Sequence, residues 1–296
     1  MGSKRIFTGA ATAVITPFKK NEIDYESYAR FIEFQIENSI DALVVCGTTG
    51  EASTLTDDEH KKMIDFTVEK VNGRVKVIAG AGSNDTAYAV ELSKYAEKSG
   101  ADAILQVTPY YNKATQKGLI RHFLTIADSV STPIILYNVP ARTNLNITPA
   151  TYAELSKHEN IVATKEASGD LGAIIQIRAL CGSDFDIYSG EDKNIVPILS
   201  VGGAGVISVV SNILPRQTHD MCELYLNGKV KESADLQIKY IDVIDALFSE
   251  VSPVPVKTAL NMMGLDSGEA RLPLIEMEEN NKVLLAAVLK KHGIVK

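Results

Sequence analysis

The sequence predicts an α/β fold, namely a (β/α)8 TIM barrel with a C-terminal helical appendage. Three observations support this prediction. Short apolar runs alternate with segments of helical periodicity, which is typical of parallel strands covered by helices. Eight such runs follow one another, which favours a closed barrel over an open sheet. After about residue 213 no strand pattern remains, and the segments that follow have helical patterns.

The expected strands are short and consist mostly of β-branched and other apolar residues. Turn-forming residues follow most of them directly, as expected where a strand leads into a loop. In chain order the strands are expected at 11–15, 42–45, 75–79, 103–107, 134–137, 161–164, 186–189 and 205–209.

Capping residues mark the starts of several helices. Asp24 and Thr148 are favoured N-cap residues, and Pro149 occupies the first helical position after Thr148. Thr56 and Glu59 have the spacing of a capping box, in which each side chain binds the other residue's backbone N–H. Further helices are expected at about 84–98, 115–130, 170–180 and 193–200, and in the tail at 214–226, 230–248, 254–263 and 283–291. We therefore divide the chain into a barrel with the active site, 1–224, and a C-terminal helical domain, 225–296.

Composition excludes several classes of function. The net charge is −7, and no basic run or basic-aromatic pattern indicates a nucleic-acid surface. No apolar stretch is long enough to span a bilayer, and the first residues lack the apolar segment of a signal peptide. The three cysteines are far apart and predict neither disulfides nor a metal site, which favours reduced thiols in the cytoplasm. No nucleotide or dinucleotide loop is present, so neither a metal nor a cofactor is expected.

A lysine follows the expected strand 161–164. Burial disfavours the charged ammonium, so Lys165 would have a lowered pKa and would act as a nucleophile toward a carbonyl carbon. A solvated lysine at a strand end is the alternative when this stretch is considered alone. In a barrel, however, catalytic residues gather at the carboxyl ends of the strands. The residues expected there are Thr48, Thr49, Tyr110, Tyr111, Tyr137, Arg142, Lys165 and Gly190.

This set suits a carbonyl substrate held as a Schiff base, with tyrosine moving protons. It contains no histidine base. Each member also has a structural explanation: Tyr110 and Tyr111 as packing aromatics, and Arg142 as a surface ion pair.

Six motifs along the chain extend this set. They are Gly47-Thr48-Thr49-Gly50-Glu51, Tyr110-Tyr111-Asn112, Tyr137-Asn138-Val139-Pro140-Ala141-Arg142-Thr143, Lys165-Glu166-Ala167, Gly205-Val206-Ile207-Ser208 and Val254-Pro255-Val256-Lys257. In order, and over essentially the whole chain, they resemble the pyruvate-dependent lyases of the dihydrodipicolinate synthase and N-acetylneuraminate lyase superfamily. The resemblance is to the synthases in particular, because they carry an arginine at the position of Arg142 and the sialic-acid lyases do not. Asn144 replaces the glycine usual in the family, but asparagine tolerates the left-handed backbone region.

The resemblance implies a role for each residue. Lys165 would form the imine with pyruvate, and Tyr137, Thr48 and Tyr111 would relay protons, with Tyr111 lent by a neighbouring subunit. The pyruvate carboxylate would bind at Thr48 and Thr49. The carboxylate of L-aspartate β-semialdehyde would bind to Arg142, and the backbones of Gly190 and Ile207 would contact substrate near the imine.

The implied reaction condenses pyruvate with L-aspartate β-semialdehyde to give 4-hydroxy-tetrahydrodipicolinate, the first committed step toward diaminopimelate and lysine. A homo-oligomer, most often a tetramer built as a dimer of dimers, is implied as well. One alternative is a pyruvate-dependent aldolase acting on a sugar acid, as in N-acetylneuraminate lyase, and Arg142 argues against it. Another is a barrel that senses a keto acid without turnover, which would have lost the nucleophile or the relay.

The resemblance also implies a regulatory site for lysine, the end product of the pathway. Tyr88 stands where lysine-inhibited relatives carry a glutamate, and Asp57 stands where some carry a histidine. A neutral tyrosine cannot pair with the ammonium of bound lysine, so we expect weak or absent inhibition. The full degenerate site comprises Ala52, Ser53, Asp57, His60, Asn84, Tyr88 and Tyr110.

Overall fold

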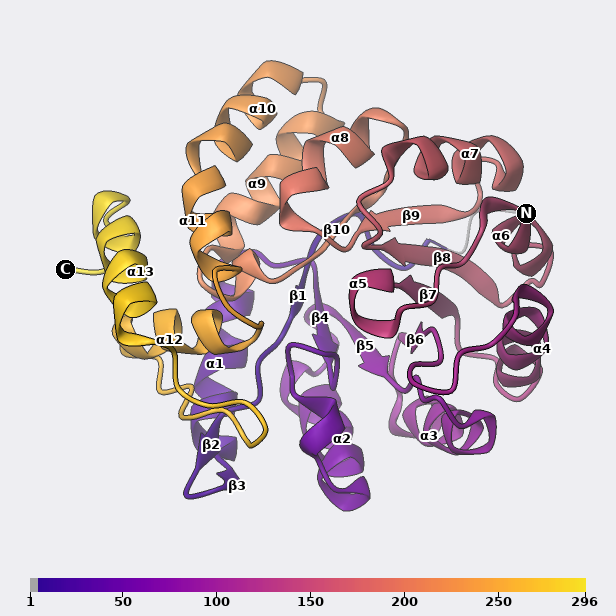
Figure 1. Cartoon of the computed structure of the whole chain (residues 1–296), viewed down its shortest axis with the longest axis horizontal. Coiled ribbons are helices and arrows are strands. Elements are labelled where there is room, and N and C mark those ends of the chain that lie inside the picture. Colours follow the sequence, from indigo (N-terminus) through magenta and orange to yellow (C-terminus); the bar gives the residue numbers. More distant parts are fainter. Residues whose placement is uncertain (1–4) are drawn as a thin grey trace.

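The computed structural model of the protein describes residues 5–296, so the interpretation of the first four residues falls outside it. Eight parallel strands close into a barrel in the order β1-β10-β9-β8-β7-β6-β5-β4, which confirms the predicted fold class (Figure 1). The barrel strands are β1 (Gly9–Ala13), β4 (Ala42–Val45), β5 (Lys76–Gly80), β6 (Ala103–Val107), β7 (Ile134–Asn138), β8 (Ile161–Glu166), β9 (Asp186–Ser189) and β10 (Gly205–Ser208).

Helices between the strands form the outer layer of the barrel (Figure 1). The predicted helix starts are confirmed: Asp24 caps α1, Thr148 caps α6, and the capping box of Thr56 and Glu59 opens α2. These helices are α1 (Tyr25–Glu37), α2 (Asp57–Val71), α3 (Thr86–Ser99), α4 (Gln116–Ala127), α5 (Pro140–Thr143), α6 (Pro149–Leu155), α7 (Leu171–Cys181), α8 (Ile195–Ser200) and α9 (Pro215–Leu226).

The C-terminal segment is helical, as predicted. The prediction of one helix at 230–248 is wrong, because two helices occupy this range and the helical structure is interrupted at Tyr240. The division at 224/225 falls in the last turn of α9 and stays an interpretation. These helices are α10 (Val230–Lys239), α11 (Ile241–Leu247), α12 (Val254–Met262) and α13 (Glu279–Lys291). Among residues 5–296 no helix is long and apolar enough to cross a membrane.

Other differences from the prediction are local. The first strand runs from Gly9 to Ala13, two residues earlier than expected, and the short helix α5 lies where only a loop was expected. A small antiparallel hairpin of β2 (Phe18–Lys19) and β3 (Glu22–Ile23) was not predicted. Its strands are two residues long, too short to show alternation.

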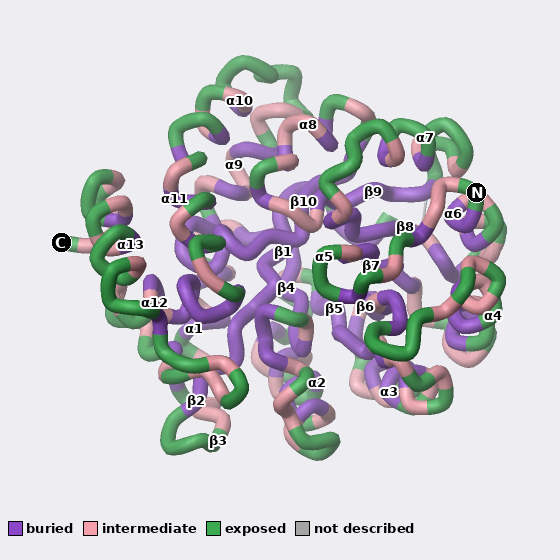
Figure 2. The backbone as a smooth tube through the Cα atoms, viewed as in Figure 1, coloured by how far each residue is buried: buried purple, intermediate pink, exposed green. Residues whose placement is uncertain are grey.

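Burial follows the layers of the barrel, with buried strands inside exposed helix surfaces and loops (Figure 2). Alternate residues of each strand face opposite sides. One set packs against the helices. The other set fills the barrel interior with small and branched side chains, including Ala11, Val44, Ile135 and Ala163. Lys165 lies two residues after Ala163 on β8, so its side chain continues on the interior face.

Candidate active site

Lys165 lies at the carboxyl end of β8, and its side chain is buried. Strand register places it beside Tyr137 of β7, and its Nζ lies 4.3 Å from the centre of the Tyr137 ring. Burial lowers the pKa of Lys165 to about 8, with Arg142 adding to this effect and Asp192 opposing it. With such a pKa, about a tenth of the amines are neutral at pH 7, far more than for a solvated lysine.

Gly190 brings backbone against the stem of this lysine. A Cβ at position 190 would lie 2.8 Å from Ala167 Cβ and 3.1 Å from Lys165 Cγ, so a side chain does not fit without movement. Ile207 is buried on β10, in the cluster that fills the barrel interior. Gly190 therefore follows the end of β9, as expected from the sequence, and Ile207 lies on the interior face of β10.

Tyr137 is buried, and burial raises the pKa of its phenol. The nearby charge of Arg142 and a hydrogen bond with the Thr48 hydroxyl both act to lower that pKa. The phenol is therefore protonated at neutral pH, and the Thr48 side chain lines the same cavity, which suits a proton relay.

The turn after β4 holds Thr48 and Thr49. It is closed by two backbone bonds, from Gly50 N to the Gly47 carbonyl (3.1 Å) and from Glu51 N to the Thr48 carbonyl (3.1 Å). Thr48 is exposed, whereas Thr49 is buried. The turn thus exposes one threonine and buries the other.

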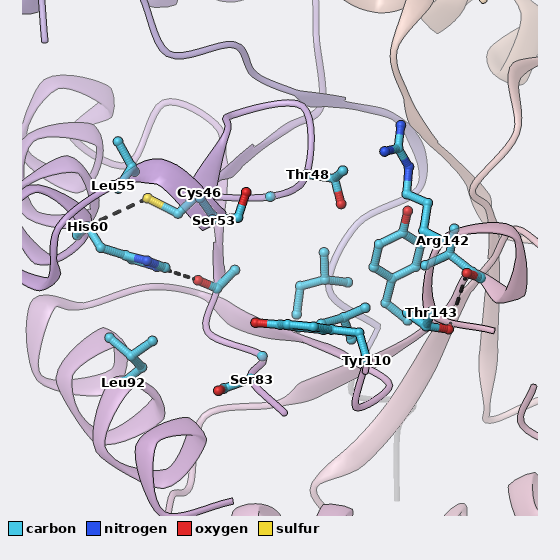
Figure 3. A pocket seen from close by; sticks show the side chains of 18 of the residues that line it. Cys46, Thr48, Ser53, Leu55, His60, Ser83, Leu92, Tyr110, Arg142 and Thr143 are labelled. Carbon is cyan, nitrogen blue, oxygen red and sulfur yellow. Dashed lines mark hydrogen bonds between the residues drawn. The ribbon is translucent and has the colours of Figure 1, made fainter. Parts of the chain in front are cut away.

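A cavity of about 420 Å³ lies beside this turn (Figure 3). Thr48, Tyr137 and Arg142 line it on one side, and Ser53, His60, Tyr88 and Tyr110 continue its lining toward α2 and α3. Part of the expected catalytic group and part of the expected regulatory group therefore share one cavity. Other expected site residues do not line this cavity: Lys165, Thr49, Gly190, Ile207, Tyr111, Asp57 and Asn84.

Arg142 is exposed on α5, and its side chain reaches toward the cavity (Figure 3). Its Nη2 donates a hydrogen bond to the Ser252 carbonyl (3.2 Å). No described carboxylate forms an ion pair with it, so the predicted alternative of a surface ion pair is wrong for residues 5–296. Asn144 ends α5 in the left-handed region (φ 53°), which confirms that asparagine is tolerated at this position.

Tyr111 differs from the other expected catalytic residues. It is 93% exposed, and its backbone has φ of 70°, a value that non-glycine residues rarely adopt. The hydroxyl is not brought to the cavity of its own chain.

The expected regulatory residues form a connected group. The Tyr88 hydroxyl donates to Asp57 (2.8 Å), which also pairs with Lys61 (2.7 Å). These hydrogen bonds, from Lys61 first and then Tyr88, lower the pKa of Asp57, and burial raises the pKa of Tyr88 to about 12. His60 Nε2 contacts the Gly80 carbonyl at 2.7 Å, and Asn84 donates to the Tyr110 carbonyl (3.0 Å). Tyr88 is therefore neutral, and the Asp57 carboxylate already has two partners.

Asp192 is a site residue that sequence reasoning missed. Its Oδ2 accepts hydrogen bonds from the backbone N–H groups of Val209 (3.2 Å) and Val210 (2.9 Å), while its buried Oδ1 has no hydrogen-bond partner among the described residues. Burial raises its pKa, and Lys165 opposes that rise. Its position two residues after Gly190, at the end of β9, was the signal available in the sequence.

Comparisons with known proteins agree on one family. The model of the dihydrodipicolinate synthetase family matches residues 6–292. A 4-hydroxy-tetrahydrodipicolinate synthase of Acetivibrio thermocellus is 55% identical over 292 residues, covering 99% of each chain. Among solved structures, dihydrodipicolinate synthase of Thermotoga maritima has a TM-score of 0.96 at 44% identity and covers 98% of this chain and 100% of that chain. A monomeric dihydrodipicolinate synthase variant matches equally well, with a TM-score of 0.96 at 44% identity and 98% of each chain covered.

Proposed function

The chain belongs to the dihydrodipicolinate synthetase family, and from this membership we propose how its own residues carry out the reaction. The chain is a Schiff-base lyase of lysine and diaminopimelate biosynthesis. It condenses pyruvate with L-aspartate β-semialdehyde to give 4-hydroxy-tetrahydrodipicolinate. The sugar-acid alternative has no support from these relatives.

Lys165 is the proposed nucleophile. Its neutral amine attacks the keto carbon of pyruvate, and loss of water gives the imine. The imine withdraws electrons from the methyl group, which loses a proton and becomes an enamine. The enamine carbon attacks the aldehyde of the second substrate. The amino group of that substrate then attacks the imine carbon, closes the ring and releases the Lys165 amine.

The remaining roles follow from the placement of each group. Tyr137 lies beside Lys165 and lines the same cavity as Thr48, so these two hydroxyls move protons during imine formation and ring closure. Thr48 and Thr49 bind the pyruvate carboxylate through hydroxyl and backbone donors. Arg142 faces the cavity without an acidic partner among residues 5–296, so it binds the carboxylate of the semialdehyde. The backbones of Gly190 and Ile207 contact the substrate near the imine.

Tyr111 is the third member of the proposed relay, and a second subunit supplies it. Its exposure and rare backbone angle support this role, since such strain is found where a side chain is held for function. A homo-oligomer follows, with a tetramer built as a dimer of dimers as the proposed form. The three cysteines are free, which supports the proposed cytoplasmic location.

The observation that carries the proposal is the buried amine of Lys165 against Tyr137, with a pKa of about 8. Borohydride reduction in the presence of pyruvate, followed by peptide mapping, tests it. Wild type and Lys193→Ala should both gain the adduct on the peptide that contains Lys165, because Lys193 lies on the surface and pairs with Asp245. Lys165→Ala should gain none. An adduct that persists on Lys193 or Lys257 in that variant would overturn the assignment.

A further inference from the structure

The turn that holds Thr48 and Thr49 ends in a buried ion pair. Glu51 Oε1 lies 2.7 Å from Nζ of Lys257 on α12, and the two side chains are 0% and 3% exposed. Burying both charges is costly, because each loses its hydration. The residues are 206 positions apart, so the pair joins the barrel to the C-terminal segment.

Every charged atom of this pair has a partner. Lys257 Nζ also donates to the carbonyls of Thr16 (3.0 Å) and Glu269 (2.6 Å), which completes its three hydrogen bonds. Glu51 Oε2 accepts a hydrogen bond from the backbone N–H of Arg271 (2.9 Å). The ammonium is therefore fixed in position, with no hydrogen left to offer a substrate.

The segment after α12 also contacts the first part of the same polypeptide chain. The Arg271 guanidinium donates to the Thr54 carbonyl (2.9 Å) and pairs with Glu59 (2.6 Å) at the start of α2. The Phe18 ring lies 4.6 Å from Lys257 Nζ and 4.2 Å from the Arg271 guanidinium carbon. In Figure 1 the chain after α12 accordingly runs beside β2, where Phe18 bridges to Gly268.

Anchoring Glu51 restrains the catalytic turn itself. The Glu51 N–H closes the turn on the Thr48 carbonyl, and the Glu51 backbone has φ of 55°, in the left-handed region. A non-glycine residue there needs support from its surroundings. Stability alone is a weak explanation for the pair, because apolar residues of similar volume often stabilise a protein as well as a buried ion pair does.

We propose that Lys257 and Glu51 are positioning residues, whose ion pair holds Thr48 and Thr49 in the geometry that binds pyruvate. The C-terminal segment would thereby set part of the active site from outside the barrel. This inference rests on the proposed roles of Thr48 and Thr49. It predicts a selective defect, because Arg142 binds the second substrate through a different element.

Glu51→Gln is the principal test. It keeps the shape of the side chain but removes the charge that fixes Lys257. We expect the KM for pyruvate to rise by about ten-fold or more, since small misplacements of binding groups have large effects. The KM for the semialdehyde should change by less than about two-fold, because Arg142 is carried by α5 and not by the turn that Glu51 closes. Lys257→Met should show the same pattern where it folds, and thermal unfolding is measured for each variant.

Two controls separate the explanations. Asp186→Asn breaks another ion pair with a buried carboxylate, that of Arg5 and Asp186 (3.0 Å), at the opposite end of the barrel. It should lower thermal stability and leave both KM values unchanged.

Thr49→Val tests the underlying role directly. If Thr49→Val leaves the KM for pyruvate unchanged, the proposed role of the turn fails. If Thr49→Val raises it while Glu51→Gln does not, or if Glu51→Gln raises both KM values equally, the positioning role is wrong.

Discussion

The pH dependence of imine formation follows directly from the environment of Lys165. Only the neutral amine attacks pyruvate, and burial lowers the pKa of Lys165 from 10.5 to about 8. Below that pH the neutral fraction falls ten-fold per unit, so about a tenth remains at pH 7 and about a hundredth at pH 6. The rate of imine formation should therefore rise with pH and level off above about pH 8. An ordinary lysine would still be gaining rate at pH 10.

Trapping with cyanoborohydride measures this rate without the second substrate. Enzyme and limiting pyruvate are mixed at a series of pH values, and the reduced adduct on Lys165 is quantified by mass spectrometry. Because pyruvate is limiting, the profile reports the free enzyme. An inflexion near 10.5, the value of an unperturbed lysine, would refute the argument that burial activates the amine.

Asp192→Asn sharpens the same test. The carboxylate of Asp192 acts to raise the pKa of Lys165, so its removal should move the inflexion to lower pH. Asparagine keeps an oxygen that accepts the N–H groups of Val209 and Val210. Asp186→Asn, at the other end of β9, is the matched control and should leave the inflexion in place. An unchanged inflexion in Asp192→Asn would exclude its charge as an influence on Lys165.

Three further predictions concern the second substrate, the oligomer and regulation. Arg142→Ala should raise the KM for the semialdehyde by about ten- to a hundred-fold, the equivalent of roughly 1.5–3 kcal/mol for a charged hydrogen bond, and an unchanged KM in steady-state kinetics would contradict its role. Mixing Tyr111→Phe with Lys165→Ala should restore some activity when subunits exchange, and a fully active monomer in sedimentation would argue against shared sites. Lysine should inhibit weakly or not at all, because Tyr88 is neutral and Asp57 already pairs with Lys61. Half-inhibition at submillimolar lysine would show that this reasoning is wrong.

Local patterns in the sequence were sufficient for most of the fold. The capping box of Thr56 and Glu59 and the N-cap at Thr148 depend on neighbours in sequence, so they are readable without the structure. The break at Tyr240 was not, because no proline or glycine marks it. Strand runs also depend on neighbours in sequence, so they were recovered within about two residues. The hairpin of β2 and β3 was missed because its strands are too short to show a pattern.

The candidate site was predictable to the extent that barrel geometry decides it. Residues at the carboxyl ends of parallel strands meet at one end of the barrel, so Lys165 and Tyr137 were expected together and are paired in register. Contacts from the C-terminal segment follow no such rule. The hydrogen bond of Arg142 to Ser252 spans 110 residues, and the ion pair of Glu51 spans 206, so only the folded chain shows them.

Two buried lysines in this protein show why burial alone does not identify a nucleophile. Lys257 has a carboxylate and two carbonyls as acceptors, so its ammonium is held in place and away from reaction. Lys165 Nζ, by contrast, has no hydrogen-bond acceptor among the described residues and lies over the Tyr137 ring. Between pH 8 and 10.5 the unfolded chain holds a proton on Lys165 that the folded protein has lost, so this group adds stability as pH rises through that window. Below pH 8 the lowered pKa costs about 3 kcal/mol of folding free energy. Burial lowers the pKa of Lys257 as well, and Glu51 opposes that shift. Both lysines therefore bear a cost of burial, and the difference in pairing separates the reactive amine from the structural one.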